Sequence, residues 1–281
     1  MLTKIITKLF EKMIKPIQGK LNWQTFFETL YRLSLTGMNI GEGADSENSG
    51  EVFVLKYIRE KNKKMNDLTI FDVGANVGKY TLLINKVFGE KKLKIFSFEP
   101  SKKSFEKLTA NIKGVHKLKI FNLGFGEKKG TATLFSDKNG SSLSSLYKRK
   151  LDHFNLQVNI KETVNIETVD DFCLKNNITH INFLKLDTEG NELQILKGAD
   201  KMINSGKIDF IQFEFGGCNI DSKTYFQDFY YLLNQRYQIY RVLKNGLLPI
   251  KKYRETNEIF LTTNYLAEKK IVIENITKKH N

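Results

Sequence analysis

Two periodicities follow one another along the chain. In the first part, apolar residues recur every three or four positions, which predicts helices at residues 1–17 and at Trp23–Leu35. Residues 37–51 then break this pattern with Gly, Asn, Asp and Ser, and we expect a loop there. From Thr69 onward, short apolar runs alternate with helical patterns, as in βαβ units. The sequence therefore predicts a doubly wound α/β fold, with a mostly parallel sheet, helices on both faces and additional N-terminal helices.

The apolar runs predict seven strands in the main sheet, at Thr69–Val73, Lys94–Phe98, Lys119–Leu123, Asn182–Asp187, Phe210–Phe215, Gln238–Leu243 and Glu258–Thr262. The helical patterns between them lie at Lys79–Phe88, Lys102–Ile112, Val169–Asn176, Glu192–Asn204 and Tyr225–Asn234. Gly130–Phe135 and Thr163–Ile166 look like an extra strand pair inserted after the third core strand. We expect one domain at residues 51–266, a helical extension and loop at 1–50, and a tail at 267–281.

Composition excludes some classes of site but does not identify a single partner. The chain has 281 residues, 41% of them hydrophobic, which is enough for the core of one large domain. Its net charge of +14 favours nucleic acid, acidic lipid or acidic glycan as partners, or is simply solvated surface. Two cysteines and four histidines are too few and too scattered for a disulfide framework or a Cys-rich zinc site. We therefore expect no metal and a cytoplasmic setting.

The first helix is amphipathic and basic. Lysines alternate with its apolar positions, so neither a transmembrane span nor a secretory leader is expected within residues 1–17. Such a helix either lies on an anionic membrane, here the inner face, or packs on its own domain or a second subunit. The apolar side is formed by Leu2, Ile5, Ile6, Leu9, Phe10, Met13, Ile14 and Ile17.

A glycine turn, DVGANVG at residues 72–78, follows the first predicted strand. Gly74 and Gly78 lack a Cβ, so the backbone can turn tightly and a ligand can approach the free N–H groups of the next helix. The spacing differs from the Gly-x-Gly-x-x-Gly of dinucleotide sites, and Asp72 would repel a pyrophosphate. A carboxylate here suits the cationic amino group of S-adenosylmethionine; the alternative is an acidic structural turn.

The next predicted strand ends in Phe98-Glu99-Pro100. Glu99 follows the glycine turn by roughly the spacing of a ribose ligand, and an ionised carboxylate can accept hydrogen bonds from two adjacent hydroxyls. Both signals lie at the carboxyl ends of successive strands, where open α/β sheets bind ligands. We therefore expect Glu99 to bind the ribose of the cofactor.

A third group of polar residues lies in FLKLDTEGNE, at residues 183–192. Strand alternation puts Lys185 and Asp187 on one face, where an ion pair between them would make Asp187 a weaker base. Glu189 and Glu192 open the following helix, and for Glu192 a capping role is favoured over a functional one. Asp187 ends its strand in the expected cleft, so we assign it a function.

Glu214 lies in the adjacent predicted strand, in the sequence IQFEFGG. Because Ile211, Phe213 and Phe215 share one face of that strand, Glu214 lies on the other. We expect it either in a buried polar network or against the substrate.

Together, DVGANVG, FEP, FLKLDTEGNELQILKGA and FEF resemble the FkbM family of methyltransferases, over roughly residues 37–262. The resemblance implies a Rossmann-like, seven-stranded sheet with an antiparallel last strand. It also implies S-adenosylmethionine-dependent methyl transfer to an oxygen, typically a hydroxyl of a sugar or polyketide-like metabolite. By this resemblance, the cofactor-binding positions are Asp72, Gly74, Asn76, Gly78 and Glu99, with Asn122 and Leu123 near the adenine.

The family's second signature matches Lys185, Asp187, Glu189 and Glu192, and their individual roles stay open. We assign Lys185, Asp187 and Glu189 to catalysis, and Glu192 and Glu214 to the substrate. A divalent cation held by Asp187, Glu189 and Glu214 is the alternative to a metal-free site.

Two other functions stay open. One is RNA ribose methylation, which the net charge permits. The other is a cofactor-binding scaffold without turnover. A small-molecule or glycan acceptor is favoured, and the Ser-rich segment 137–149 is either a lid or acceptor loop or a plain solvated loop.

Overall fold

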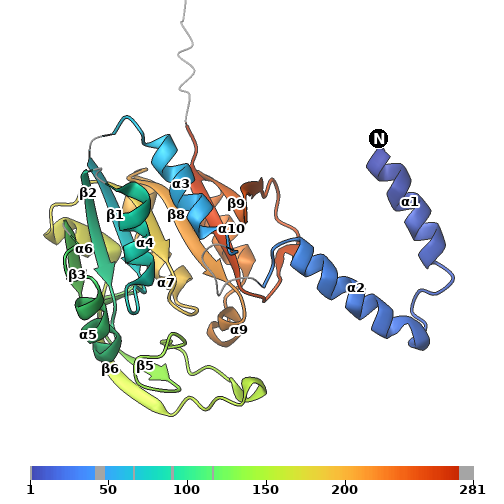
Figure 1. Ribbon diagram of the computed structural model, residues 1–281, viewed down its shortest axis with the longest axis horizontal. Coiled ribbons are helices and arrows are strands. Elements are labelled where there is room, and N and C mark those ends of the chain that lie inside the picture. The colour runs from blue at the N-terminus through green and yellow to red at the C-terminus, as the bar shows by residue number, and fades with distance from the viewer. Residues whose placement is uncertain (1, 42–47, 66, 90–91, 116, 272–281) are drawn as a thin grey trace, which may run out of the picture.

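The structure is a computed structural model, and it describes residues 2–41, 48–65, 67–89, 92–115 and 117–271. Figure 1 shows a central sheet covered by helices, a smaller sheet beside it, and two N-terminal helices that project away from both.

The main sheet has eight strands in the order β10-β9-β11-β8-β7-β1-β2-β3. β3, β2, β1, β7 and β8 are parallel to one another, while β11 is antiparallel to both β8 and β9. The strands of this sheet are β1 (Asp67–Val73), β2 (Lys92–Phe98), β3 (Leu118–Phe121), β7 (Ile181–Leu186), β8 (Ile208–Phe215), β9 (Tyr237–Leu243), β10 (Gly246–Pro249) and β11 (Thr263–Lys269).

The small sheet has the order β4-β6-β5, with β5 and β6 antiparallel, and confirms the predicted inserted pair. Its strands are β4 (Gly124–Phe125), β5 (Gly130–Ser136) and β6 (Ile160–Glu167). The α-helices are α1 (Leu2–Ile14), α2 (Gln24–Gly37), α3 (Glu51–Lys61), α4 (Lys79–Phe88), α5 (Lys102–Asn111), α6 (Val169–Lys175), α7 (Glu192–Lys197), α8 (Asp200–Asn204), α9 (Cys218–Ser222) and α10 (Phe226–Leu233). Short 3-10 turns are η1 (Leu21–Trp23), η2 (Asp152–Phe154) and η3 (Glu255–Asn257).

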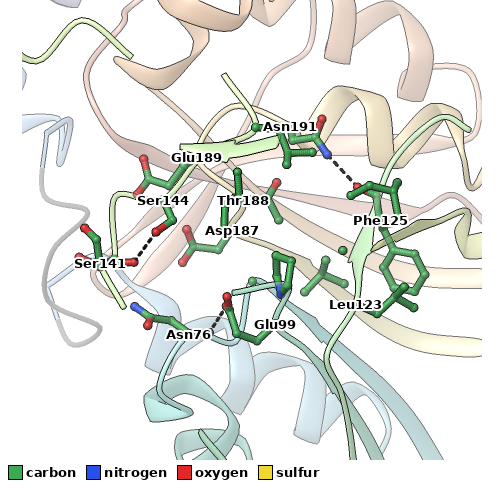
Figure 2. A pocket seen from close by; sticks show the side chains of 18 residues that line it. Asn76, Glu99, Leu123, Phe125, Ser141, Ser144, Asp187, Thr188, Glu189 and Asn191 are labelled. Carbon is green, nitrogen blue, oxygen red and sulfur yellow. Dashed lines mark hydrogen bonds between the residues drawn. The ribbon is translucent and has the colours of Figure 1, made fainter. Parts of the chain in front are cut away.

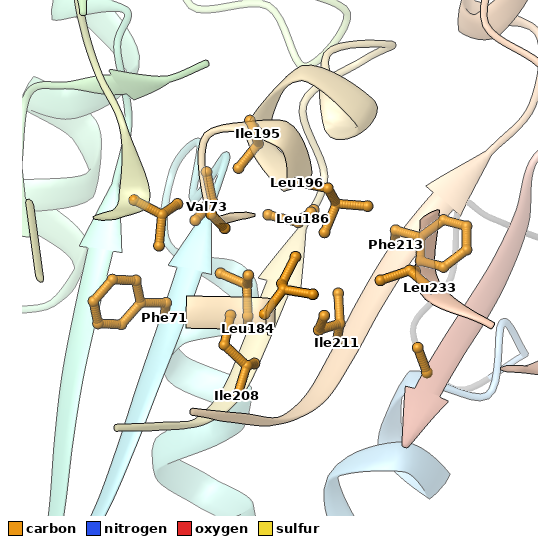
Figure 3. Packing of buried hydrophobic residues seen from close by; sticks show 14 of the residues in the cluster. Phe71, Val73, Leu184, Leu186, Ile195, Leu196, Ile208, Ile211, Phe213 and Leu233 are labelled. Carbon is orange, nitrogen blue, oxygen red and sulfur yellow. The ribbon is translucent and has the colours of Figure 1, made fainter. Parts of the chain in front are cut away.

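Apolar side chains fill both faces of the sheet, because β1, β7 and β8 carry buried residues on each side. On one face, residues such as Phe71, Leu184 and Ile211 pack against α6, α7, α8 and α10 (Figure 3). On the other face, Ile70 and Phe183 pack against α3 and α4. The predicted α/β class, with helices on both faces and an antiparallel last strand, is confirmed.

The strand order reverses between β1 and β7. The chain runs from β1 outward through β2 and β3, and then returns to the other side of β1 with β7. Such a switch point opens a crevice at the carboxyl ends of the strands, where α/β proteins bind their ligands. Gly74 and Asn76 follow β1 and Glu99 follows β2, so the topology directs these three predicted residues to this crevice.

The predicted strand at Glu258–Thr262 was wrong, and the last strand is instead β11. The Glu258 carboxylate accepts hydrogen bonds from the backbone N–H groups of Phe226 and Gln227 at 2.8 Å each. Glu258 therefore caps α10 and holds this segment away from the sheet, although Phe260 still packs against the core. Consequently residues 267–269 of the predicted tail belong to the sheet, and residues 272–281 lie outside the described residues.

Three other differences have local causes. The sheet has eight strands and not seven, because β10 forms a hairpin with β9. The predicted helix Glu192–Asn204 is two helices, because the Asp170 carboxylate accepts from the N–H groups of Lys201 and Met202 and starts α8 there. The sequence analysis also missed α3, which covers the sheet beside α4. Part of the predicted loop at 37–51, residues 42–47, lies outside the described residues.

Candidate functional site

The turn after β1 brings two strand ends into direct contact. The backbone N–H of Asp187, after β7, donates to the carbonyl of Val73 at 3.0 Å. Gly74 has a φ of +84°, and a Cβ there would lie 1.8 Å from the Asp187 carbonyl oxygen. Only glycine therefore allows the end of β1 to approach the end of β7 this closely.

A cavity, here called the donor cavity, opens above these strand ends (Figure 2). Apolar residues from the strand ends and the small sheet form one side, and polar residues form the other. Its walls include Gly74, Asn76, Glu99, Leu123, Phe125, Ile166, Asp187, Thr188 and Glu189.

Glu99 lies in this cavity and is held by two backbone groups. The N–H groups of Asn76 and Ser101 each donate to its carboxylate at 2.8 Å. Burial raises the pKa of Glu99 to about 7, against the opposing effect of these two bonds. The side-chain oxygen of Asn76 is also buried, and none of the described residues donates a hydrogen bond to it. Both groups retain capacity to bind a polar ligand.

The Ser-rich segment 137–149 lies against the site and is not a plain solvated loop. Ser141, Ser142 and Ser144 line the donor cavity. The hydroxyl of Ser145 donates to the carbonyl of Glu189 at 2.6 Å, and Arg149 pairs with the Glu189 carboxylate at 2.5 Å. These contacts fix the segment to the turn that follows β7.

Behind the turns, a row of polar residues crosses the sheet on the face covered by α3 and α4. Ser97, Asp72, Lys185 and Gln212 occupy matching positions on β2, β1, β7 and β8. All four are buried, and Gln212 continues the row by donating to Asn264 of β11 at 3.0 Å. The strand register thus assembles a polar network inside an otherwise apolar layer.

Lys185 is the centre of that network. Its Nζ lies 2.8 Å from Asp187 Oδ2, 3.5 Å from Glu51 Oε1 and 4.3 Å from the ring centroid of Tyr80. Burial alone would lower the pKa of Lys185, but the surrounding carboxylates outweigh it and hold the pKa well above its usual value. Lys185 is therefore a fixed cation, and its predicted pairing with Asp187 is confirmed.

A second cavity, here called the acceptor cavity, lies on the α3 and α4 side. It encloses about 650 Å³, which is the size of a small-molecule site. It shares Gly74, Asn76, Ser142, Asp187 and Glu189 with the donor cavity, so the two adjoin. Its remaining walls include Gly41, Glu51, Lys79, Tyr80, Lys185, Glu214 and Thr262.

Carboxyl groups dominate the polar lining of the acceptor cavity. Burial raises the pKa of Glu51, although Lys185 opposes the change, and burial together with Asp187 raises that of Glu189 to about 8. Burial also raises the pKa of Glu214, with Asp187 and Glu189 adding to the effect. The four carboxyl groups of this lining outnumber its two cations, and a pKa of about 8 keeps a proton on Glu189 at neutral pH.

Four predicted site residues lie outside both cavities. Asp72 is fully buried and accepts from Thr81 at 2.6 Å, while Gly78 packs under α5. Asn122 donates to the carbonyls of Glu99 and Pro100 and so braces the end of β2. Glu192 is fully buried and accepts from the N–H groups of Thr188 and Gly190, so it is structural as favoured, but it holds the turn before α7 and does not cap that helix.

The sequence analysis missed Glu51, Tyr80 and Gln212 as site residues. The sequence pattern could have indicated Gln212, since it is a polar residue within an apolar strand, at the position that pairs with Lys185. No sequence pattern indicated Glu51 and Tyr80, because they come from helices whose packing brings them to the strand ends. Tyr80 donates to Gln212 at 3.4 Å, and Gln212 donates to Glu51 at 3.3 Å.

Two further features concern metals and membranes. Within the part of the chain that the structure describes, no three or more His, Cys, Asp or Glu residues are grouped as a metal site requires. No helix among the same residues combines the length and apolar character needed to cross a membrane.

The chain is similar in sequence to known methyltransferases. The chain is 22% identical over 169 residues to the hexuronic acid methyltransferase AglP of Haloferax volcanii, covering 59% of this chain and 64% of that protein. It is 24% identical over 150 residues to Methyltransferase 1 of Beauveria bassiana, covering 48% and 59% of the two chains. The match thus spans less than two thirds of each of these relatives.

Among solved structures, the methyltransferase FkbM from Methylobacillus flagellatus matches 72% of this chain and 44% of its own, at 18% identity and a TM-score of 0.44. A family model, the methyltransferase FkbM domain, matches residues 72–241, which is more than half of the chain. The matched range includes the glycine turn, Glu99, and the segment from Lys185 to Glu214. The chain therefore belongs to the FkbM family of methyltransferase domains.

Proposed function

We propose that the protein is an S-adenosylmethionine-dependent O-methyltransferase that acts on a hydroxyl of a sugar, a glycan or a related metabolite. One observation carries the proposal: two adjoining cavities share Asp187 and Glu189 at the switch point of the sheet. A methyl donor on one side and an acceptor on the other would meet at these carboxyl groups. Proximity and orientation of this kind are what group transfer between two bound molecules requires.

The donor cavity fits S-adenosylmethionine. Leu123, Phe125 and Ile166 offer an apolar surface for an adenine ring. Glu99 is at the position suited to the ribose hydroxyls, and the free side-chain oxygen of Asn76 can accept from a polar group of the ligand. When bound, S-adenosylmethionine supplies a methyl group activated by its sulfonium. Asp72, being buried, would act by bracing Thr81 at the start of α4.

Asp187 is the group that meets the acceptor. It directly follows β7 and lines both cavities, and its side chain is 38% exposed, whereas that of Lys185 is only 3% exposed. Lys185 stays protonated and fixes the Asp187 carboxylate through one oxygen. The other oxygen is available to orient a hydroxyl and accept its proton, as general-base assistance requires. Glu189, held by Arg149, lies beside it on the same wall.

The charge of the acceptor cavity favours an uncharged acceptor. Glu51, Asp187, Glu189 and Glu214 line it, against the cations Lys79 and Lys185. Carboxylates accept hydrogen bonds from hydroxyls, and protonated carboxyls also donate them. An RNA phosphate or a hexuronate would instead meet like charge, and desolvating it there would be costly. The positive net charge of the chain therefore does not make RNA the better candidate.

The test is transfer of labelled methyl groups from S-adenosylmethionine to a panel of acceptors. The panel contains neutral glycans, the matching hexuronate-containing glycans and RNA, and Asp187→Asn serves as the inactive control. We expect label in the neutral glycans, in a bond that resists mild alkali as an ether does. Label in an alkali-labile ester of a hexuronate, or in RNA, would contradict the proposal. Cofactor binding without transfer to any member would indicate a scaffold.

A further inference from the structure

α1 and α2 form an arm that leaves the body of the protein (Figure 1). Along α2, Leu35 is the only buried residue, and it lies at the end where the helix joins the domain. From residue 8 to residue 13, every side chain of α1 is exposed. The arm is attached to the domain through Ile40, which is buried, and through Gly41, whose N–H donates to the Thr262 carbonyl at 3.0 Å.

The exposed side chains of the arm include large apolar residues. Phe26, Leu30 and Leu33 recur at helical spacing on one side of α2, and they are 52%, 44% and 64% exposed. On α1, Leu9, Phe10 and Met13 are more than half exposed. A surface that leaves so many large apolar groups in water marks a binding site.

The charges and aromatic residues of the arm indicate what it binds. Residues 1–37 contain six basic and two acidic residues, and Lys8, Lys12, Lys15 and Lys20 are all exposed. Lysines beside an apolar face, together with Trp23 of η1 and the Phe residues of α2, match the composition of helices that lie in an anionic membrane surface. Pairing two copies through this face would instead bring like charges together.

We propose that α1 and α2 bind the surface of an anionic membrane, with their apolar residues inserted and their lysines at the lipid headgroups. The consequence for the site is geometric. Gly41 and Thr262, where the arm joins the domain, both line the acceptor cavity. Binding through the arm holds the mouth of that cavity near the membrane, where lipid-borne acceptors are concentrated.

Cosedimentation of the full chain with vesicles tests this. We expect binding to phosphatidylcholine vesicles that contain phosphatidylglycerol, weaker binding at high salt, and little binding to phosphatidylcholine alone. Phe26→Ser with Leu30→Ser should lower the partition coefficient at least tenfold, because both side chains lose apolar area available for insertion. Lys8→Gln, Lys12→Gln and Lys15→Gln together should lower it about a hundredfold, at about fivefold for each lysine.

Matched controls lie on the body of the domain. Phe154 on η2 and Leu174 on α6 are 63% and 78% exposed, so Phe154→Ser with Leu174→Ser removes the same two side-chain types. Lys113→Gln, Lys128→Gln and Lys197→Gln remove the same charge from exposed positions outside the arm. Equal binding by the arm variants and the controls would overturn the proposal. So would a change from oligomer to monomer caused by Phe26→Ser with Leu30→Ser and seen by light scattering, since a second copy would then be the occupant. Neither readout depends on methyl transfer.

Discussion

The donor and acceptor cavities share a wall but are assembled in different ways. The donor cavity is formed mainly by turns that directly follow β1, β2, β3 and β7, so its residues come in short continuous motifs. The acceptor cavity shares the turn after β1, and its other walls come from scattered residues of α3, α4, β7, β8, the Ser-rich segment and the segment before β11. The first presents an apolar wall opposite a polar one, whereas the polar lining of the second is mainly a charged network. On the proposed function, the fold itself would supply the cofactor site, and individual side chains would decide the choice of acceptor.

The largest effect is expected for a change to Asp187, which lies in the wall that the two cavities share. Asp187→Asn keeps the shape of the side chain and removes its charge. We expect turnover to fall about 10²–10⁴-fold, the usual contribution of a general base, with cofactor affinity nearly unchanged. Single-turnover kinetics and calorimetry measure the two quantities, with Asp200→Asn on the surface of α8 as the control. Near-normal turnover would show that Asp187 only closes the end of the strand.

Chelation of the wild-type protein tests whether the same carboxylate holds a metal. If Asp187 acts without one, wild-type activity survives EDTA. Loss of wild-type activity on chelation, with recovery on addition of Mg²⁺, would instead support a cation held by Asp187, Glu189 and Glu214.

The second prediction concerns the acceptor side alone. Lys185→Met leaves the buried carboxyl groups of Glu51 and Asp72 without their cation. Breaking a buried ion pair in this way destabilises a protein by about 3–5 kcal/mol. We expect this loss in the free energy of unfolding at alkaline pH and a smaller loss in acid, where the carboxyl groups are protonated. Urea denaturation measures it, and an equal loss at both pH values would argue against the charged network.

The third prediction concerns pH. Burial raises the pKa of Glu99 to about 7 and that of Glu189 to about 8. Groups with a raised pKa in the folded state contribute stability below their unfolded pKa and lose it as pH rises through the folded value. The free energy of unfolding of the ligand-free protein should therefore fall from about pH 5 to about pH 8, by up to about 3 kcal/mol for Glu99.

Glu99→Gln should flatten this profile, and Glu106→Gln on the surface of α5 should not. Denaturation curves collected across the same range test both. A stability that rises over this interval would contradict the assigned environment of Glu99.

The smallest effect is expected for a change in the donor cavity that lowers cofactor affinity. Glu99→Ala removes a carboxylate suited to the ribose hydroxyls, and we expect cofactor affinity to fall about 10–150-fold, at about 1.5–3 kcal/mol. The Michaelis constant for the acceptor should not change. Calorimetry checks the first and steady-state kinetics the second, with thermal unfolding as a check on folding because Asn76 and Ser101 also lose their acceptor. Unchanged cofactor affinity in a folded variant would remove Glu99 from the ribose site.

The same contrast explains what the sequence could predict. Gly74 and Glu99 were found because a strand followed by a turn is a local pattern, and the strands themselves are continuous apolar runs. The ion pair between Lys185 and Asp187 was also found, because two residues two positions apart in a strand share a face. These features depend only on neighbours along the chain.

What the sequence could not predict depends on contacts between distant segments. The apolar residues at 259–261 favoured a strand, but Glu258 caps α10 and keeps the segment out of the sheet. Glu51 reaches Lys185 only because α3 packs beside α4. Asp72 was expected to bind the cofactor from the strand end, but its alternating position turns it toward Thr81 and the polar row. In each case, contacts with residues far away in the sequence determine where the residue or segment lies.

In the proposed arrangement, donor and acceptor meet at Asp187 from opposite sides. A crystal structure with bound S-adenosylhomocysteine would show whether they do. We expect the adenosyl group in the donor cavity, ribose hydroxyls within hydrogen-bonding distance of Glu99, and the sulfur directed toward Asp187, with the acceptor cavity left open. A ligand found instead in the acceptor cavity between Glu51 and Glu214, or one whose sulfur points away from Asp187, would contradict it.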